Sequence, residues 1–176
     1  YQRISDVPDH KYYMNFMKTK HRGPDSSKFE IIDNTLILGH HRLSINGLGE
    51  SGDQPIHRDG VYLIANAEIY NWKELYDKYH SVFQRRTNSD CEVILELYLH
   101  LGLSETCKLI RGEWAFIIYD TRNKIFCVAR DCIGKRPLYI GNDECGEYGF
   151  ASEAMSLTGM YENVMQFKPG MYSEYC

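Results

Sequence analysis

The chain has 176 residues, of which 43% are hydrophobic and 25% charged, so it is long enough to bury the core of one globular domain. Its net charge is −4 and its Lys and Arg residues are scattered, which argues against a surface for nucleic acid or an acidic membrane. No apolar run approaches the roughly 20 residues of a membrane-spanning helix, and no signal peptide is visible.

The predicted elements begin with a helix from about Asp9 to Thr19, in which Pro8 suits the first turn. Its apolar stripe consists of Tyr12, Tyr13, Phe16 and Met17. A loop over residues 21–27 follows, because Gly23-Pro24 breaks regular structure. Two short apolar runs bounded by turn residues then predict buried strands. They are Thr35 to Leu38 and Val61 to Ala65.

Two further helices are predicted from capping boxes. The first begins near Asn71, where Asn71-x-x-Glu74 precedes an apolar repeat of Trp72, Leu75, Tyr76 and Tyr79. The second begins at Ser89, with Glu92 three residues later. Its expected buried face consists of Val93, Ile94, Leu97, Tyr98 and Leu101.

The last third of the chain predicts strands joined by turns. Trp114 to Tyr119 and Ile125 to Ala129 form a hairpin around residues 120–123. Shorter strands are expected over 138–140, 148–151 and 171–174. This order favours the α+β class, with mainly antiparallel sheets and helices on their outer faces.

Six cysteines occupy positions 91, 107, 127, 132, 145 and 176, and none belongs to a C-x-x-C pair. A zinc site is therefore not expected, and the sequence predicts no metal ligands. Cys91, Cys107 and Cys127 lie in apolar periodic segments, which favours buried free thiols in a reducing compartment. We therefore expect a cytoplasmic protein.

Eight short motifs follow one another in an order that carries more information than any one of them. They are His21-Arg22-Gly23-Pro24-Asp25, Gly39-His40-His41-Arg42-Leu43-Ser44-Ile45, Asp53-Gln54-Pro55-Ile56, Asn66-Ala67-Glu68-Ile69-Tyr70-Asn71, Ser89-Asp90-Cys91-Glu92-Val93-Ile94, Arg111-Gly112-Glu113-Trp114-Ala115-Phe116, the run from Ala129 to Tyr139, and Ala151-Ser152-Glu153. The series resembles the glutaminase domain of asparagine synthetases, a class II glutamine amidotransferase. The resemblance implies one such domain over residues 1–176, with a four-layer α/β/β/α sandwich of the N-terminal-nucleophile hydrolase type.

The resemblance also implies hydrolysis of glutamine to glutamate and ammonia, for ATP-dependent amidation of aspartate. Such domains use a cysteine at the mature N-terminus, whose free α-amino group serves as the base. Here position 1 is Tyr1, and an internal cysteine cannot substitute because its backbone nitrogen is an amide. Two explanations stay open: the sequence lacks its first segment, or the protein is a non-catalytic pseudoglutaminase. A β-lactam synthetase-like enzyme, which shares this first domain, is a third.

By resemblance, an oxyanion hole comes from the Asn66 side chain and the backbone N–H of Ala67, where the family has Asn-Gly-Glu. The methyl group of Ala67 either crowds the site or is harmless at an ordinary negative φ. Arg42 is expected to bind the α-carboxylate of glutamine, and Glu68 and Asp90 its α-ammonium group. The alternatives are an exposed Arg or Glu after a strand, and an Asp favoured by a helix dipole.

Other motif residues have supporting roles. Arg22 and Asp25 are expected to order the first loop, and Arg130 and Asp131 to form an ion pair or to face a synthetase domain. His40 and His41 are adjacent and point in opposite directions in an extended chain, so a paired-ligand site is not expected.

An ATP-binding Ser-Gly-Gly-x-Asp-Ser loop is absent from the sequence. We therefore expect no cofactor in this domain, with ATP and Mg²⁺ belonging to a synthetase domain absent from the sequence. The expected partners are glutamine and a synthetase domain in cis or in trans; homo-oligomerisation is left open.

Overall fold

The computed structural model describes residues 9–32, 36–43 and 53–175. The expectations for Pro8, Thr35, Ser44, Ile45 and Cys176 lie outside these residues. No helix in the described ranges is long and apolar enough to cross a membrane.

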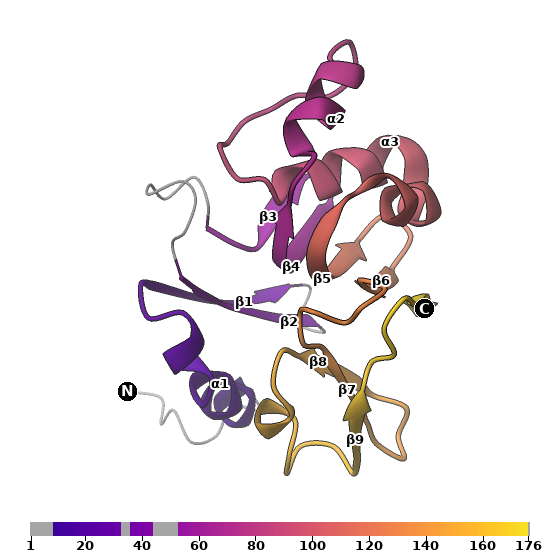
Figure 1. Cartoon of the computed structure of the whole chain (residues 1–176). Coiled ribbons are helices and arrows are strands. Elements are labelled where there is room, and N and C mark those ends of the chain that lie inside the picture. Colours follow the sequence, from indigo (N-terminus) through magenta and orange to yellow (C-terminus); the bar gives the residue numbers. More distant parts are fainter. Residues whose placement is uncertain (1–8, 33–35, 44–52, 176) are drawn as a thin grey trace.

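The described strands form three sheets, and every pairing between these strands is antiparallel, in agreement with the predicted mainly antiparallel arrangement (Figure 1). The central sheet has the order β10-β6-β5-β4-β3 and contains β3 (Ile56–Arg58), β4 (Val61–Ile69), β5 (Gly112–Asp120), β6 (Ile125–Arg130) and β10 (Tyr172–Tyr175). A hairpin pairs β1 (Ser26–Ile32) with β2 (Leu36–Arg42), and a third sheet has the order β8-β7-β9, with β7 (Tyr139–Asn142), β8 (Tyr148–Ala151) and β9 (Asn163–Gln166).

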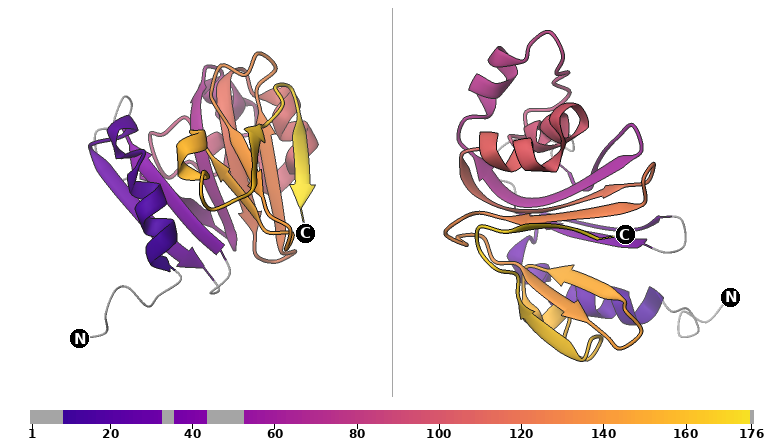
Figure 2. Two further views of the ribbon diagram at one scale, coloured as in Figure 1. Left: turned by 90° about the horizontal axis from the view of Figure 1, so that it is seen from below. Right: turned by 90° about the vertical axis from the view of Figure 1, so that its right-hand side faces the viewer.

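These sheets and the three α-helices of the described residues stack in layers (Figure 2). The helices are α1 (Asp9–Met17), α2 (Trp72–Lys78) and α3 (Glu92–Leu109). Helices α2 and α3 cover one face of the central sheet, and the β1–β2 hairpin and the β8-β7-β9 sheet share the other face. Helix α1 lies outside the hairpin, where the Phe16 ring stacks on His41 with centroids 3.8 Å apart. A side chain at Gly39 would collide with this ring, so glycine permits the close approach.

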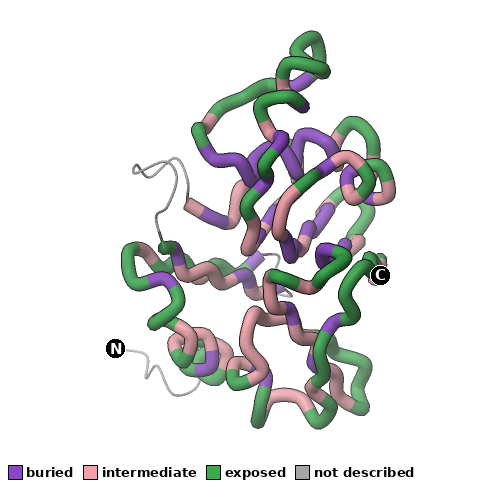
Figure 3. The backbone as a smooth tube through the Cα atoms, in the orientation of Figure 1, coloured by how far each residue is buried: buried purple, intermediate pink, exposed green. Residues whose placement is uncertain are grey.

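The largest core lies between the central sheet and α3, where Figure 3 shows buried segments gathered. Leu63, Ile94, Leu97 and Ile118 are fully buried there. Two smaller clusters form on the other face: one around Leu36 at the hairpin, and one between the central sheet and the third sheet. The core is therefore continuous on the helix side and divided on the opposite side.

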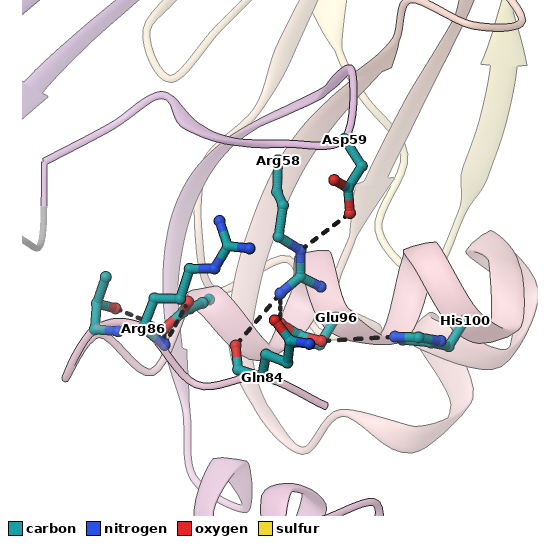
Figure 4. Close-up of polar contacts among 8 residues, drawn as sticks. Arg58, Asp59, Gln84, Arg86, Glu96 and His100 are labelled. Carbon is teal, nitrogen blue, oxygen red and sulfur yellow. Dashed lines mark hydrogen bonds and ion pairs between the residues drawn. The ribbon is translucent and has the colours of Figure 1, made fainter. Parts of the chain in front are cut away.

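A buried ion pair joins β3 to α3 within the larger core (Figure 4). Arg58, which is 8% exposed, donates from Nη1 to Oε1 of the fully buried Glu96. The same nitrogen lies 3.3 Å from the carbonyl oxygen of Gln84. The second oxygen of Glu96 has no hydrogen-bond partner and lies 3.8 Å from Nε2 of His100.

Both predicted capping boxes are wrong. The Asn71 side chain makes no capping bond and instead joins two distant backbone groups, Leu109 C=O at 3.0 Å and Arg111 N–H at 2.8 Å. Cys91 takes the N-cap position of α3, and the Glu92 carboxylate accepts bonds from the preceding loop, residues 86–87. Tertiary contacts compete for side chains that could cap a helix locally.

Element boundaries also differ from the prediction. Strand β4 continues four residues beyond Ala65, and β1 begins at Ser26, inside the predicted loop. Strands β1, β3 and β9 were not predicted: β3 has only three residues, and the side chains of β1 and β9 are mostly exposed. Leu101, expected on the buried face of α3, is 38% exposed beside the non-helical Gly102. The hairpin of β5 and β6 is confirmed.

Candidate functional site

A cleft of about 940 Å³ lies between the central sheet and the divided second layer. Its walls include α1, β2, β4, β5, β8 and the segment before α3. The residues singled out from separate motifs all line it: Arg42, Asn66, Ala67, Glu68 and Asp90. The fold therefore brings together three segments that are distant in sequence.

Strand β4 presents alternate side chains to the cleft and to the helix-side core. Asn66 and Glu68 share the face of Tyr62 and Ile64, which pack against the β1–β2 hairpin. Ala67 packs against the opposite core, and its φ is not positive. Its methyl group thus points away from the cleft, which favours the alternative that Ala67 does not crowd a ligand there.

The backbone N–H of Ala67 faces an uncovered edge of β4. On either side of it, Ala65 N–H donates to Oε1 of Gln54 at 2.6 Å, and Ile69 N–H donates to Oδ2 of Asp90 at 2.7 Å. Alternate N–H groups of a strand point to the same edge, so the Ala67 N–H points there as well. Among the described strands, β3 covers only the first three residues of β4. This edge presents a backbone donor to the cleft.

Asp90 is buried, and its contact with Ile69 N–H joins the segment before α3 to β4. A carboxylate at this place therefore stabilises the strand edge as well as lining the cleft. Glu68, which lies inside β4 and not after a strand, has a side chain that is 53% exposed.

Arg42 is the last residue of β2 and is buried, so the alternative of an exposed arginine after a strand is wrong. Its Nη1 donates to Oδ1 of Asp53 at 2.8 Å. Lys28 lies 3.6 Å from the other oxygen of that carboxylate. The Asp25 N–H donates to the Arg42 carbonyl at 3.1 Å, which ties the first loop to β2.

Arg22 also lines the cleft, and its Nη1 lies 3.1 Å from Oε1 of Glu153, which follows β8 in the chain. His41 makes two contacts of its own, one to Ser27 at 2.8 Å and one to the Phe16 carbonyl at 2.9 Å. Burial, reinforced by the neighbouring charge of His41, lowers the pKa of His40 to about 4. The His40 imidazole is thus neutral at pH 7.

Cys91 is the buried thiol that lines the cleft. Its Sγ lies 3.8 Å from the carbonyl oxygen of Ala67. Burial raises the pKa of Cys91 to about 12, and the charge of Asp90 adds to the effect. A thiol with this pKa is a poor nucleophile at neutral pH because the thiolate is the reactive form.

The predicted ion pair between Arg130 and Asp131 is wrong. Arg130 donates to three backbone carbonyls, those of residues 134, 136 and 167. Asp131 accepts from the backbone N–H groups of residues 114, 133, 135 and 136, and these bonds lower its pKa against the effect of burial. The two side chains together hold the turn between β6 and β7.

That turn carries Arg136, which also lines the cleft and for which the sequence motif predicted no role. The feature of the sequence that could have indicated Arg136 is the pair Lys135-Arg136, which concentrates positive charge at one point of the motif. Within the described ranges, no three His, Cys, Asp or Glu side chains gather so that they could hold a metal ion.

The free edges of two strands face the cleft. β2 contributes the consecutive residues 36–42 and β8 the consecutive residues 148–151. Because neighbouring residues of a strand point to opposite faces, such unbroken runs place the strand edges in the wall. Among the described strands, β2 pairs with β1 and β8 with β7. Each edge therefore presents backbone hydrogen-bonding groups.

The chain matches the glutamine amidotransferase domain family over residues 5–176. It is 44% identical over 155 residues to glutamine-hydrolyzing asparagine synthetase 2 of Arabidopsis thaliana, and 39% identical over 155 residues to asparagine synthetase B of Escherichia coli strain K12. Each alignment covers 87% of this chain but 26% and 27% of the relatives. The chain thus spans about a quarter of their length.

Two solved structures are similar to it. The glutamine phosphoribosylpyrophosphate amidotransferase of B. subtilis superposes with a TM-score of 0.65 at 25% identity, covering 77% of this chain and 32% of that one. The allosteric regulatory enzyme of purine biosynthesis reaches 0.76 at 21% identity, covering 92% and 43%. The predicted α+β sandwich of the N-terminal-nucleophile hydrolase type is confirmed.

Proposed function

Because this chain belongs to the glutamine amidotransferase domain family, we propose that its cleft binds glutamine and that the domain releases ammonia from the side-chain amide. The observation that carries the proposal is the convergence of Arg42, Asn66, Glu68 and Asp90 with the N–H of Ala67 in one cleft. Together they offer a cation, two carboxylates and two amide donors. Glutamine has a matching carboxylate, ammonium group and polar amide.

Each group has a role that follows from its charge and place. The Arg42 guanidinium binds the α-carboxylate, and Asp53 beside it holds the guanidinium in position. Glu68 and Asp90 bind the α-ammonium group. The Asn66 side chain and the Ala67 N–H stabilise the oxyanion that develops on the amide carbonyl.

We place the nucleophile on an extended strand that begins with cysteine and enters between the edges of β2 and β8. Both edges offer backbone groups to such a strand. Its α-amino group would take the thiol proton, since His40, with a pKa of about 4, is too weak a base for this step. Cys91 remains a thiol and does not compete as the nucleophile. The strand belongs either to the same polypeptide or to a partner.

At the level of the whole protein, we propose that the ammonia serves the ATP-dependent amidation of aspartate in the cytoplasm. The basis is similarity to asparagine synthetases over 87% of this chain. ATP and Mg²⁺ would bind to a synthetase domain, in cis or in trans, and not to the residues of this cleft.

Isothermal titration of the 176-residue chain with L-glutamine tests the binding site. Arg42→Ala should abolish detectable binding, because a charge-assisted pair contributes roughly 1.5–3 kcal/mol. Lys28→Ala is the matched control: Lys28 also contacts Asp53 but does not line the cleft. Unchanged affinity in Arg42→Ala would show that the carboxylate binds elsewhere.

A coupled glutamate dehydrogenase assay tests the chemistry. The polypeptide beginning at Tyr1 should bind glutamine without releasing ammonia. Lengthening it by an N-terminal strand that starts with cysteine should produce release, and the same strand starting with alanine should not. Asn66→Ala should then lower the rate by about 10²–10³. Release by the polypeptide beginning at Tyr1, lost in Cys91→Ala, would assign the nucleophile to Cys91 instead.

A further inference from the structure

Arg136 occupies a turn whose backbone is held on both sides. Its N–H lies 3.3 Å from Oδ2 of Asp131, and its carbonyl accepts from Nε of Arg130 at 2.8 Å. Both of these side chains are buried. The position from which Arg136 reaches the cleft is therefore set by the core of the domain.

The guanidinium of Arg136 lies between two carboxylates. Its Nη2 is 3.6 Å from Oε2 of Glu68 and 3.5 Å from Oε2 of Glu113. These two glutamates are directly opposite in the register of β4 and β5, where like charges repel. Arg136 compensates both charges.

Arg136 contacts both carboxylates through charge, and its guanidinium N–H groups are not all engaged in hydrogen bonds. Neither carboxylate distance is short enough for a good hydrogen bond, and its buried Nε has no hydrogen-bond partner. A guanidinium held in this way can give up one carboxylate to a competing cation while it stays beside the other. Glu68 is the carboxylate that lines the cleft, whereas Glu113 does not.

We propose that Arg136 sets the affinity of the site for glutamine: it is an internal cation that neutralises Glu68 in the empty site and is displaced from Glu68 by the α-ammonium group of the ligand. This inference rests on the proposed glutamine site. Glu113 retains Arg136 when the ligand binds, so the exchange leaves no carboxylate uncompensated. A ligand without a cation has no group that displaces Arg136 from Glu68, so its affinity does not depend on Arg136.

The neighbouring charges provide a control. Lys135 lies 3.8 Å from Oε1 of Glu113 and has no contact with Glu68, although it is adjacent to Arg136 in the chain. Removing the charge of Lys135 changes the net charge by the same amount as removing that of Arg136. It leaves the competition for Glu68 intact.

The test is titration of the 176-residue chain with L-glutamine and with glutaramate, which is glutamine without its α-amino group. Arg136→Met should tighten glutamine binding by about two- to fivefold, the factor that a solvent-exposed ion pair contributes. Glu113→Gln should weaken it by a similar factor, because Arg136 then binds Glu68 alone. Glutaramate affinity should not change in either variant, and Lys135→Met should bind both ligands as the unaltered chain does.

Opposite shifts in the two variants distinguish competition from structural support. Weaker glutamine binding in both variants, or equal shifts for glutaramate, would overturn the inference and leave the proposed function standing. The same holds if Arg136→Met binds glutamine as the unaltered chain does. Failure of the unaltered chain to bind glutamine overturns the proposed function, and this inference with it.

Discussion

The two faces of the central sheet differ in how they are covered. On one face, α3 and the strands form a continuous core with Leu97 and Ile118 fully buried. On the other, the hairpin and the third sheet form separate clusters with the cleft between them. The large core and the ligand cleft therefore lie on opposite faces of one sheet. Strand β4 contributes to the core and to the cleft, because its side chains point alternately to the two faces of the sheet.

The largest effect is expected on the helix side, at Arg58. Arg58→Met should lower the free energy of unfolding by about 3–5 kcal/mol, because it leaves the carboxylate of Glu96 buried without its cation. Urea unfolding measures the loss. A second variant that also carries Glu96→Leu should recover most of it, since no buried charge then remains. A loss of equal size in both variants would show that packing and not charge is responsible.

A matched pair of leucines compares the two faces directly. Leu97→Ala, in the continuous core, should cost about 2–5 kcal/mol, while Leu36→Ala, in the smaller cluster beside the cleft, should fall near the lower limit. The difference arises because the wall of a cleft can relax into open space. Unfolding curves with equal losses would contradict the proposed division of roles.

On the cleft side, His40 should make stability depend on pH between 7 and 4. The folded pKa of His40 is about 4, below its usual value near 6.5, so the unfolded chain binds a proton first as the pH falls. Stability is therefore complete above pH 6.5 and decreases towards pH 4, by up to ~3 kcal/mol. His40→Gln should flatten this dependence in urea unfolding between pH 7 and 5. The exposed His80 is the control, and His80→Gln should keep the unaltered slope.

The smallest effect is expected at Ala67, where the two faces meet in one residue. Ala67→Gly should reduce stability by about 0.5–1 kcal/mol through backbone entropy. Glutamine affinity should be unchanged, because the methyl group points to the helix-side core while the N–H faces the cleft. A marked gain in affinity on titration would mean that the methyl group crowds the ligand after all.

Periodic apolar segments predicted the elements of the central sheet and its helices well. The hairpin of residues 114–129 and the buried residues Val93, Ile94 and Leu97 are where the pattern placed them. Charged and polar side chains were less predictable. Asn71 and Glu92 had the spacing of helix caps, yet both bind backbone groups brought close by folding. Local spacing cannot reveal which of several acceptors or donors lies nearest in three dimensions.

The sequence alone was enough to indicate the family and to predict Arg42, Asn66 and Glu68 as site residues, because the order of motifs and the chemistry of these side chains can be read along one chain. The directions and partners of the side chains became known only from the folded structure. It directs the methyl group of Ala67 away from the cleft, separates Arg130 from Asp131, and places Arg136 between Glu68 and Glu113. The physical reason is that side-chain direction, burial and charge pairing depend on strand register and layer packing, which bring together groups distant in sequence.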